Sequence, residues 1–223
     1  FSVSKPRVME FCQELKKLKL DIHWSCTIRV ADVDLDMLKT MKDANCIHVQ
    51  YGFESAAQNV LESMVKKTTV KQITNAIKWS EEAGIGVQGN FIFGDPSETP
   101  ESIRETSEFV DTYAKDHIIH ADYITPYPGS PLFINHCQEH GLIPDRKKYY
   151  ENIHLRPRFN MTKIPCKEFY NLVEPVVRNK LSPYKHASRV FFEEVIESGD
   201  GEGVALQDRR TYKTQINCPH CSH

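Results

Sequence analysis

The sequence predicts an α/β fold in which parallel strands form part of a (β/α) barrel. In some segments apolar and polar residues alternate, as in strands, and in the segments between them apolar residues recur every three or four positions, as in helices. This order predicts strands joined by helices. The strands also carry a polar residue at every second position, whereas a parallel sheet covered on both faces is apolar throughout. One face should therefore border a wet or ligand-filled space, such as the mouth of a barrel.

The strand period appears in four segments, numbered 20–29, 46–55, 85–94 and, less regularly, 121–127. The second segment shows two sets of residues that should face opposite ways. One set is Ile47, Val49, Tyr51 and Phe53, and the other is His48, Gln50, Gly52 and Glu54. Barrel folds gather their catalytic groups at the carboxyl ends of the strands. In this chain those ends carry Arg29, Glu54 with Ser55, 90–94 and 125–129.

Helical patterns with recognisable start signals separate these strands. Asp34 opens one, Thr69 with Gln72 forms a capping box at the start of another, and Thr99 caps a third. Strands that alternate with helices predict right-handed crossovers and a parallel strand order.

The chain beyond the last strand is predicted to be a helical extension. Helical patterns run through 165–180 and 183–198, and the remainder is a polar tail. We therefore predict three parts, 1–135 as the barrel portion, 136–198 as the helical extension and 199–223 as the tail.

Composition narrows the class of protein. The 28 basic and 30 acidic residues give a formal charge of −2, so no net field favours nucleic acid or an anionic membrane. Apolar runs are too short for a membrane span, and the scattered, odd-numbered cysteines favour reduced thiols. We expect a soluble, cytoplasmic protein with no membrane or nucleic-acid partner. The first residue is Phe1, which predicts a segment of a longer protein.

The terminal Cys218-Pro-His-Cys221 has the spacing of metal ligands and resembles half of a zinc ribbon. Structural zinc usually takes four ligands on two anchored turns, so a truncated ribbon or a tail without metal is the alternative.

Two segments stand out at predicted strand ends. The first, 51–55, reads Tyr-Gly-Phe-Glu-Ser, and the second, 89–99, reads Gly-Asn-Phe-Ile-Phe-Gly-Asp-Pro-Ser-Glu-Thr. Taken alone, the second is equally well an ordinary strand-to-helix loop, and Glu54 in the first is more often a structural acceptor than a ligand contact.

Five motifs occur in one order, with a strand-helix unit between neighbours. They are Trp24 with Arg29, the 51–55 segment, Leu61 with Lys66 and Thr69, the 89–99 segment, and 126–133. Together they resemble the radical S-adenosylmethionine (SAM) superfamily, particularly its branch often found with a cobalamin-binding domain. The resemblance covers roughly 1–135 well and extends more loosely to about Ser198.

The resemblance implies a partial barrel of six strands, of which this chain supplies the third to the sixth. It also implies a [4Fe-4S] cluster held by three cysteines spaced three and then two apart, and SAM cleaved reductively to a 5′-deoxyadenosyl radical. The cysteine triplet is absent from the sequence. We therefore expect the C-terminal part of a radical SAM domain, inactive alone, whose missing N-terminal part carries the cluster.

The resemblance also assigns SAM contacts by position. Glu54 with Ser55 matches the ribose-contacting site, Ile92 near Gly94 matches the adenine contact, and Lys66 matches a partner of the methionine carboxylate. Asn90, on the same predicted face, joins this set. His23, Arg29 and Gln50 point toward the predicted lumen as candidate substrate contacts, although a buried ion pair or polar core network explains them equally well.

The sequence thus predicts part of an enzyme that cleaves SAM to start radical chemistry, with cobalamin-dependent methyl transfer as one reaction of the branch. The rival hypothesis is a non-catalytic, barrel-derived module that binds a small metabolite. A Cys-x-x-x-Cys-x-x-Cys motif upstream of Phe1 would favour the enzyme. The substrate and the use of cobalamin are left open at this stage.

Overall fold

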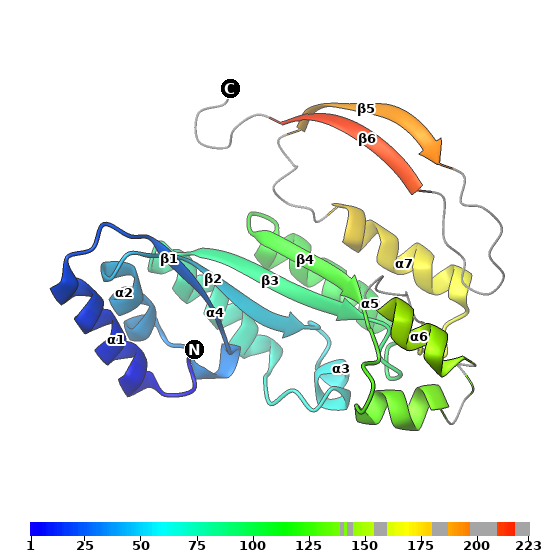
Figure 1. Cartoon of the computed structure of the whole chain (residues 1–223), viewed down its shortest axis with the longest axis horizontal. Coiled ribbons are helices and arrows are strands. Elements are labelled where there is room, and N and C mark those ends of the chain that lie inside the picture. The colour runs from blue at the N-terminus through cyan, green and yellow to red at the C-terminus, as the bar shows by residue number, and fades with distance from the viewer. Residues whose placement is uncertain (139–140, 142–144, 154–159, 180–186, 197–208, 217–223) are drawn as a thin grey trace.

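A computed structural model describes residues 1–138, 141, 145–153, 160–179, 187–196 and 209–216. Its centre is a sheet of four parallel strands in the order β1-β2-β3-β4 (Figure 1). The strands are β1 (Trp24–Ile28), β2 (Cys46–Glu54), β3 (Gly86–Phe93) and β4 (Ile118–Tyr123). This confirms the predicted parallel α/β fold, because consecutive strands pair side by side through helical connections.

Strand ends differ from the sequence prediction at both edges of the sheet. β1 begins at Trp24, four residues later than predicted, and the preceding Leu20 and Ile22 are exposed. β4 begins at Ile118, three residues earlier than predicted, and ends at Tyr123; the Ile124 N–H still donates to the Phe93 carbonyl, and 125–127 lies beyond the sheet. Edge strands have one partner only, and alternation of residue types persists beyond the last ladder hydrogen bond.

Helices cover one side of this sheet (Figure 1). They are α1 (Lys5–Leu18), α2 (Leu35–Asp43), α4 (Val70–Glu82) and α5 (Pro100–Phe109), with the short α3 (Gln58–Ser63) after β2. The predicted caps form: the Asp34 carboxylate accepts from the Met37 N–H, and Thr69 with Gln72 makes a capping box. Single turns η1 (Val30–Asp32) and η2 (Val110–Ala114) complete this part.

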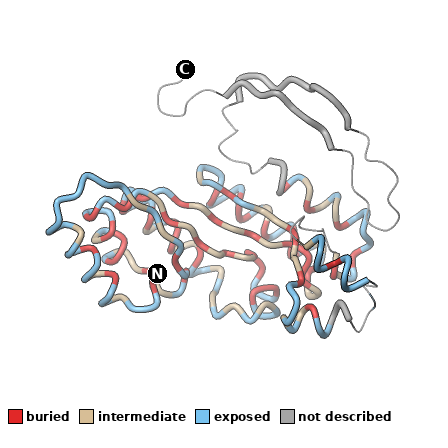
Figure 2. Tube along the Cα trace, in the orientation of Figure 1, coloured by how far each residue is buried: buried red, intermediate tan, exposed pale blue. Residues whose placement is uncertain are grey.

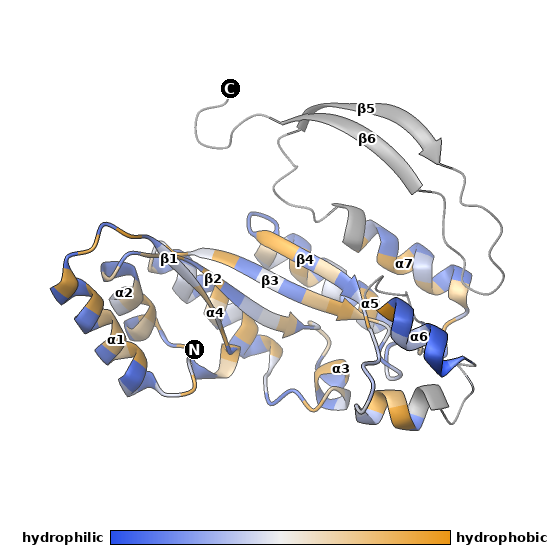
Figure 3. Ribbon diagram, in the orientation of Figure 1, coloured by the Kyte–Doolittle hydropathy of each residue, from blue (hydrophilic) through white to orange (hydrophobic). Residues whose placement is uncertain are grey.

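Buried and less buried residues alternate along the strands in Figure 2, and apolar and polar residues alternate along β3 in Figure 3, so the two faces of the sheet differ. Val49, Phe53 and Phe91 are at most 1% exposed and belong to one core with the apolar sides of the helices. Gln50, Glu54 and Asn90 point the other way and are half-buried. The predicted assignment of residues to the two faces is confirmed at these positions.

Ile47 is an exception, because it is 49% exposed instead of packed in the core. The register pairs Trp24 with Cys46 and Ser25 with His48, which leaves Ile47 as an extra residue in a β-bulge. A bulge shifts the alternation by one residue. Cys46 is therefore fully buried in the position predicted for Ile47.

The covered face includes one glycine whose small size is required. A Cβ atom at Gly89 would collide with the ring of Phe53 on the neighbouring strand. The Phe53 ring instead packs edge-on against Phe91, with centroids 5.6 Å apart. Gly89 thus allows a large aromatic residue to fill the space between β2 and β3.

The C-terminal part contains η3 (Phe133–Gln138), α6 (Arg146–Asn152) and α7 (Cys166–Asn179), then β5 (Ala187–Ile196) antiparallel to β6 (Arg209–Ile216). α7 confirms the predicted helix at 165–180. The helix predicted at 183–198 is wrong, and the predicted polar tail contains a strand. The 187–196 segment is rich in valine, phenylalanine and isoleucine, which favour strands when a partner is available. The boundaries at 135 and 198 stay predictions.

Within the described part of the chain, the structure contains no helix of the length and hydropathy that crossing a membrane requires.

A candidate cofactor site at the carboxyl edge of the sheet

The carboxyl ends of β2 and β3 bring the main predicted residues to one edge of the sheet. Gly52 pairs with Asn90, and Glu54 pairs with Phe91 after a shift in register. Glu54, Asn90 and Ile92 are all half-buried on the open face. An acid, an amide and an apolar side chain thus lie on adjacent strands, facing the same space.

Glu54 forms an ion pair that the sequence did not predict. Its Oε1 lies 2.7 Å from the Nζ atom of Lys66, and the two side chains are 16% and 36% exposed. Glu54 has a φ of +63°, which few residues other than glycine adopt. This backbone turns the carboxylate toward Lys66 at the point where β2 ends.

Gly52 provides the space for this pair. A Cβ atom at Gly52 would lie 2.5 Å from the Glu54 Oε1 and 3.3 Å from the Lys66 Nζ. A distance of 2.5 Å between a carbon and an oxygen is a steric clash. Only glycine at this position leaves the carboxylate where it is.

The loop after β3, residues 94–99, contains two buried acids that the sequence analysis quoted without giving them a role. Asp95 is 4% exposed and Glu98 is 3% exposed. The Gly94 N–H donates to the Glu98 Oε2 over 2.6 Å, and Gly94 has a φ of +111°. Glu98 therefore closes the turn that begins at Gly94. The sequence signal that could have identified these two residues is the presence of acids shortly after a glycine at the end of a strand.

The pKa of Glu98 is raised to about 8, chiefly by burial; the Gly94 hydrogen bond opposes the rise and the nearby Asp95 adds to it. The Glu98 carboxyl therefore holds its proton at neutral pH, when an exposed glutamate has released it.

Asp95 joins this loop to the segment after β2. Its Oδ1 accepts from the Ser63 hydroxyl at 2.7 Å, from the Ser97 hydroxyl at 2.6 Å and from the Ser97 N–H at 2.9 Å. Ser63 is the last residue of α3. The two segments that carry Glu54 and Ile92 are thus connected through one buried carboxylate.

Ser55 lies on the other side of the sheet from Glu54. It is 1% exposed, its Oγ lies 3.2 Å from the Thr106 Oγ1 of α5, and it accepts from the Ala57 N–H at 3.1 Å. The Thr106 hydroxyl oxygen also accepts from the Ala56 N–H at 3.1 Å. The Ser55 side chain therefore anchors the end of β2 to α5 and does not face the open side.

The three candidate substrate contacts do not lie together. Gln50 is on the open face, where its amide oxygen accepts from the Thr27 hydroxyl at 3.3 Å. Arg29 follows β1 at the carboxyl edge and is exposed, with its Nε 3.7 Å from Asp32. His23 precedes β1 and is exposed at the opposite, amino edge. The structure thus separates His23 from the site.

Further polar residues share the open face, and the sequence analysis did not name them as candidates. Gln88 donates to the Asn90 Oδ1 at 3.0 Å. His120 and Asp122 of β4 pair in register with Asn90 and Ile92. The period of β4 was too irregular in the sequence to assign these two residues to a face.

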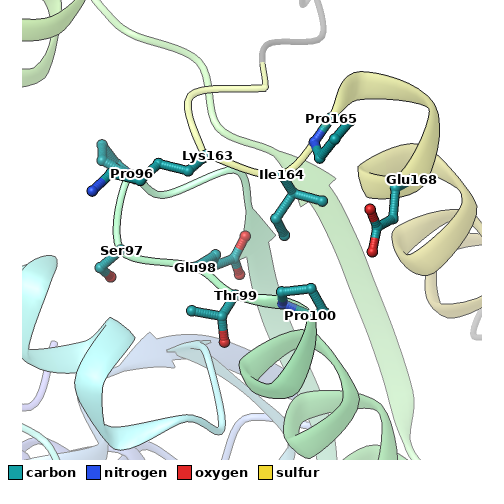
Figure 4. Close-up of a pocket in the computed structure, with 9 residues that line it drawn as sticks. All are labelled: Pro96, Ser97, Glu98, Thr99, Pro100, Lys163, Ile164, Pro165 and Glu168. Atoms are coloured by element: carbon teal, nitrogen blue, oxygen red, sulfur yellow. The ribbon is translucent and has the colours of Figure 1, made fainter.

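A pocket of about 410 Å³ lies between the 94–99 loop and the start of α7 (Figure 4). It is lined by Pro96, Ser97, Glu98, Thr99, Pro100, Lys163, Ile164, Pro165 and Glu168. Glu54 and Lys66 are not among these residues, so this pocket is distinct from the ion pair on the open face.

The described cysteines do not fit an iron-sulfur cluster. Cys12 and Cys46 are fully buried in the apolar core, Cys26 lies on the covered side of β1, and Cys166 is exposed at the start of α7. In the part of the chain that the structure describes, no three histidine, cysteine or acidic residues form a group able to hold a metal ion. Cys218 and Cys221 lie outside the described residues.

Comparison with known proteins identifies the barrel portion. Residues 4–110 match the family model of the radical SAM superfamily. This segment belongs to that superfamily. The match covers α1 through α5 and therefore includes Glu54, Lys66 and Ile92. The predicted superfamily is confirmed.

Curated relatives of this radical SAM segment include enzymes of several names. An uncharacterized methyltransferase of Pyrococcus horikoshii is 34% identical over 135 residues, which cover 60% of this chain and 29% of that protein. The anaerobic magnesium-protoporphyrin IX monomethyl ester cyclase of Rubrivivax gelatinosus is 36% identical over 134 residues, which cover 59% of this chain and 24% of that protein. The bacteriochlorophyllide d C-8(2)-methyltransferase of Chlorobaculum tepidum is 31% identical over 153 residues, which cover 66% of this chain and 33% of that protein. The aligned segments thus span a third of these relatives or less.

Among solved structures, the radical SAM methyltransferase TsrM of Kitasatospora setae superposes with a TM-score of 0.51 at 17% identity. The superposition covers 60% of this chain and 26% of TsrM, which was solved with cobalamin and a [4Fe-4S] cluster bound. At this identity the similarity shows the fold, and it agrees with the predicted partial barrel.

Proposed function

We propose that this chain provides the SAM-binding part of a radical SAM enzyme and that SAM binds at the carboxyl edge of the open face. One observation carries the proposal: a half-buried acid, Glu54, and a half-buried apolar residue, Ile92, share that face within a radical SAM segment. The residues of this chain would bind and orient SAM, whose reductive cleavage supplies a 5′-deoxyadenosyl radical.

Each proposed contact follows from the chemistry of its side chain. The two oxygens of Glu54 suit the two hydroxyls of a ribose, because a carboxylate accepts both in charge-assisted hydrogen bonds. Ile92 offers an apolar surface to the adenine. Lys66 has the charge to pair with the methionine carboxylate, and the turn at Gly94 and the Asn90 amide border the same space. Ser55 is left out, because its hydroxyl already joins β2 to α5.

The cluster has no fitting ligands among the described cysteines, so we propose that its ligands come from sequence outside these 223 residues. On this proposal the chain alone is inactive, because the electron that cleaves SAM is delivered by the cluster. The part that carries the cluster would be its main partner.

The proposed reaction class is methyl transfer to a small-molecule substrate with cobalamin. It is supported by two relatives, at 31% and 34% identity, that are named as methyltransferases. The open face would contact the substrate through Gln50, Gln88 and Arg29. The expectation of a cytoplasmic protein stays a prediction.

Binding of SAM to the intact, cluster-loaded protein tests the proposal. Glu54→Gln keeps the shape of the side chain but removes the charge, and each charge-assisted hydrogen bond contributes about 1.5–3 kcal/mol. We expect the SAM dissociation constant to rise by roughly one to two orders of magnitude. Glu62→Gln, on the exposed side of the nearby α3, is the matched control and should leave it unchanged.

Anaerobic reconstitution separates the enzyme from a non-catalytic binding module. The intact protein should form 5′-deoxyadenosine from SAM, and the 223-residue chain should form none. An intact protein that binds a metabolite but never cleaves SAM would refute the proposal. Stoichiometric iron in the chain alone, lost on replacing Cys218 and Cys221, would refute the proposed origin of the cluster ligands.

A further inference from the structure

The proposed SAM contacts come from two separate segments of the chain. Glu54 and Lys66 belong to the end of β2 and the turn after α3, whereas Ile92 and Gly94 belong to the end of β3 and the loop after it. The ribose and the adenine of SAM are joined by a single bond, which holds them at a nearly constant distance, so a ligand that touches both segments needs them at a fixed spacing. Small errors in such spacing weaken binding and catalysis strongly.

The turn after α3 transmits the position of Ser63 to Lys66. The Lys66 N–H donates to the Leu61 carbonyl at 2.8 Å and the Val65 N–H donates to the Glu62 carbonyl at 3.0 Å, which together form a Schellman motif. Val65 adopts a φ of +54°, a conformation that a β-branched residue strongly disfavours. The end of α3 is therefore a tight, strained turn, and its geometry depends on the contacts that hold it.

Asp95 supplies such a contact from the other segment. Its carboxylate is 4% exposed and is oriented by the Ser97 N–H and hydroxyl of its own loop, at 2.9 and 2.6 Å. The same oxygen accepts from Ser63, 32 residues earlier in the chain, at 2.7 Å. Thr106 also connects the two regions, but it holds Ala56 at the end of β2 and not the turn that carries Lys66.

We propose that Asp95 is a positioning residue for the cofactor site: by holding Ser63, it sets the distance between the Glu54–Lys66 side and the Ile92–Gly94 side. This inference rests on the proposed function. Asp95 need not touch SAM, and its effect passes through Ser63 and the Schellman turn to Lys66.

A matched pair of serine variants tests this role in the intact protein, loaded with its cluster in the oxidised state so that SAM is bound but not cleaved. Ser63→Ala removes the bond between the segments, and Ser97→Ala removes a bond of similar length to the same oxygen within one loop. Because Ser63 is an exposed residue and its hydroxyl is one of three donors to the same Asp95 oxygen, we expect a moderate, roughly three- to tenfold loss of SAM affinity for Ser63→Ala. Ser97→Ala should change it by less than about twofold, and Ser63→Thr, which keeps the hydroxyl, should restore it.

Competition against radiolabelled SAM with two fragments separates positioning from general destabilisation. 5′-Deoxyadenosine carries the ribose and the base but not the methionine carboxylate, so it would meet the first segment only through Glu54, the ion-pair partner of Lys66. Its affinity should fall in Ser63→Ala, by less than that of SAM. Adenine touches the Ile92 side only, and its affinity should stay the same in Ser63→Ala. A melting temperature for each variant shows that the two alanine variants are equally folded.

The outcomes distinguish this inference from the proposed function. Equal effects of Ser63→Ala and Ser97→Ala, or a loss of adenine affinity as large as that of SAM, would overturn the positioning role. If Glu54→Gln and Ile92→Ala weaken SAM but Ser63→Ala does not, the inference alone is wrong. If neither Glu54→Gln nor Ile92→Ala changes SAM affinity, the cofactor site itself is wrong.

Discussion

The helix-covered face and the open face of the sheet are built from the same four strands, yet they differ in burial and in the kind of residue they carry. On the covered face, Val49 and Phe53 are fully buried and join the helices in one apolar core. On the open face, Gln50 and Asn90 are half-buried and are hydrogen-bonded to neighbouring side chains. Consecutive residues, about 3.3 Å apart along a strand, therefore alternate between the packed core and the open face on which we propose that SAM binds.

This difference means that the register of the strands separates the effects of neighbouring substitutions. A change on the covered face removes packed contacts and leaves a cavity. A change on the open face removes little packing and alters what the surface binds. The predictions below test that separation, beginning with the largest effect.

The sharpest contrast lies between Phe91 and Ile92. Phe91→Ala should lower the free energy of unfolding by about 3–5 kcal/mol, because the side chain is 1% exposed in the core. Ile92→Ala should cost far less stability and instead weaken SAM binding in the intact protein. Chemical denaturation and isothermal titration measure the two quantities. If Phe91→Ala harmed SAM affinity in a folded protein while Ile92→Ala did not, the assignment of faces would be wrong by one residue.

The pH dependence of stability tests whether Glu98, a buried acid at the carboxyl edge of the sheet, is protonated in the folded protein. Its pKa is raised from 4.5 to about 8 by burial. Between these values the native protein keeps a proton that the unfolded chain has released, so the free energy of unfolding falls as pH rises and levels off above about 8. Glu98→Gln removes this titration and should become more stable than the original protein by up to about 5 kcal/mol at the upper end, since the two pKa values differ by about 3.5 and each pKa unit contributes about 1.4 kcal/mol.

Urea denaturation at a series of pH values checks this prediction. The two proteins should converge at low pH, near the ordinary pKa of a glutamate, where both the folded and the unfolded Glu98 carboxyl are protonated. A constant difference between Glu98→Gln and the original protein across the whole range would contradict the buried, protonated carboxyl.

Gly52→Ala tests the open face without removing any side chain. The new Cβ would overlap the Glu54 Oε1 and displace it from Lys66. We expect SAM affinity to fall by roughly tenfold, with a stability loss of about 1 kcal/mol. Gly86→Ala is a control at the amino end of the same face, where the new atom would approach His48 at 3.0 Å. Comparable losses of SAM affinity in both variants would mean that the effect is not local to Glu54.

Thr27→Val should have the smallest effect. It removes a hydroxyl that donates to Gln50 at 3.3 Å on an exposed part of the open face, and such changes usually alter stability by less than about 0.5 kcal/mol. The converse change, Val49→Thr, buries a hydroxyl on the covered face and should cost about 1–3 kcal/mol. Thermal denaturation compares the two, and equal costs would contradict the difference between the faces.

Much of this barrel portion was predictable from the sequence, because local signals agree with the tertiary fold. The capping box at Thr69 and the cap at Asp34 form as predicted, and the alternation in 46–55 assigns Val49 and Gln50 to opposite faces. The predicted side of Ile47 was wrong, because the bulge depends on how β2 pairs with the neighbouring strand. The alternation of residues within β2 alone does not reveal it.

The site was predictable only in part. Glu54 and Ile92 lie on the predicted face, but His23 lies at the far edge and Ser55 faces α5. Asp95 and Glu98 were missed, because their roles depend on burial and on a partner such as Ser63, which is distant in the sequence. The helix predicted at 183–198 failed because strand formation there depends on pairing with 209–216.

By itself, then, the sequence determined the order of strands and helices in the barrel portion, the buried face of Val49, Phe53 and Phe91, and the match of the 4–110 segment to the radical SAM superfamily, since these follow from local periodicity and from motifs in a fixed order. Only the tertiary structure decided that Lys66 pairs with Glu54, that Gly52 makes room for them, and that Asp95 connects the two segments that carry Glu54 and Ile92. These are contacts between residues brought together by folding, and their energy depends on burial and distance, which no local pattern encodes.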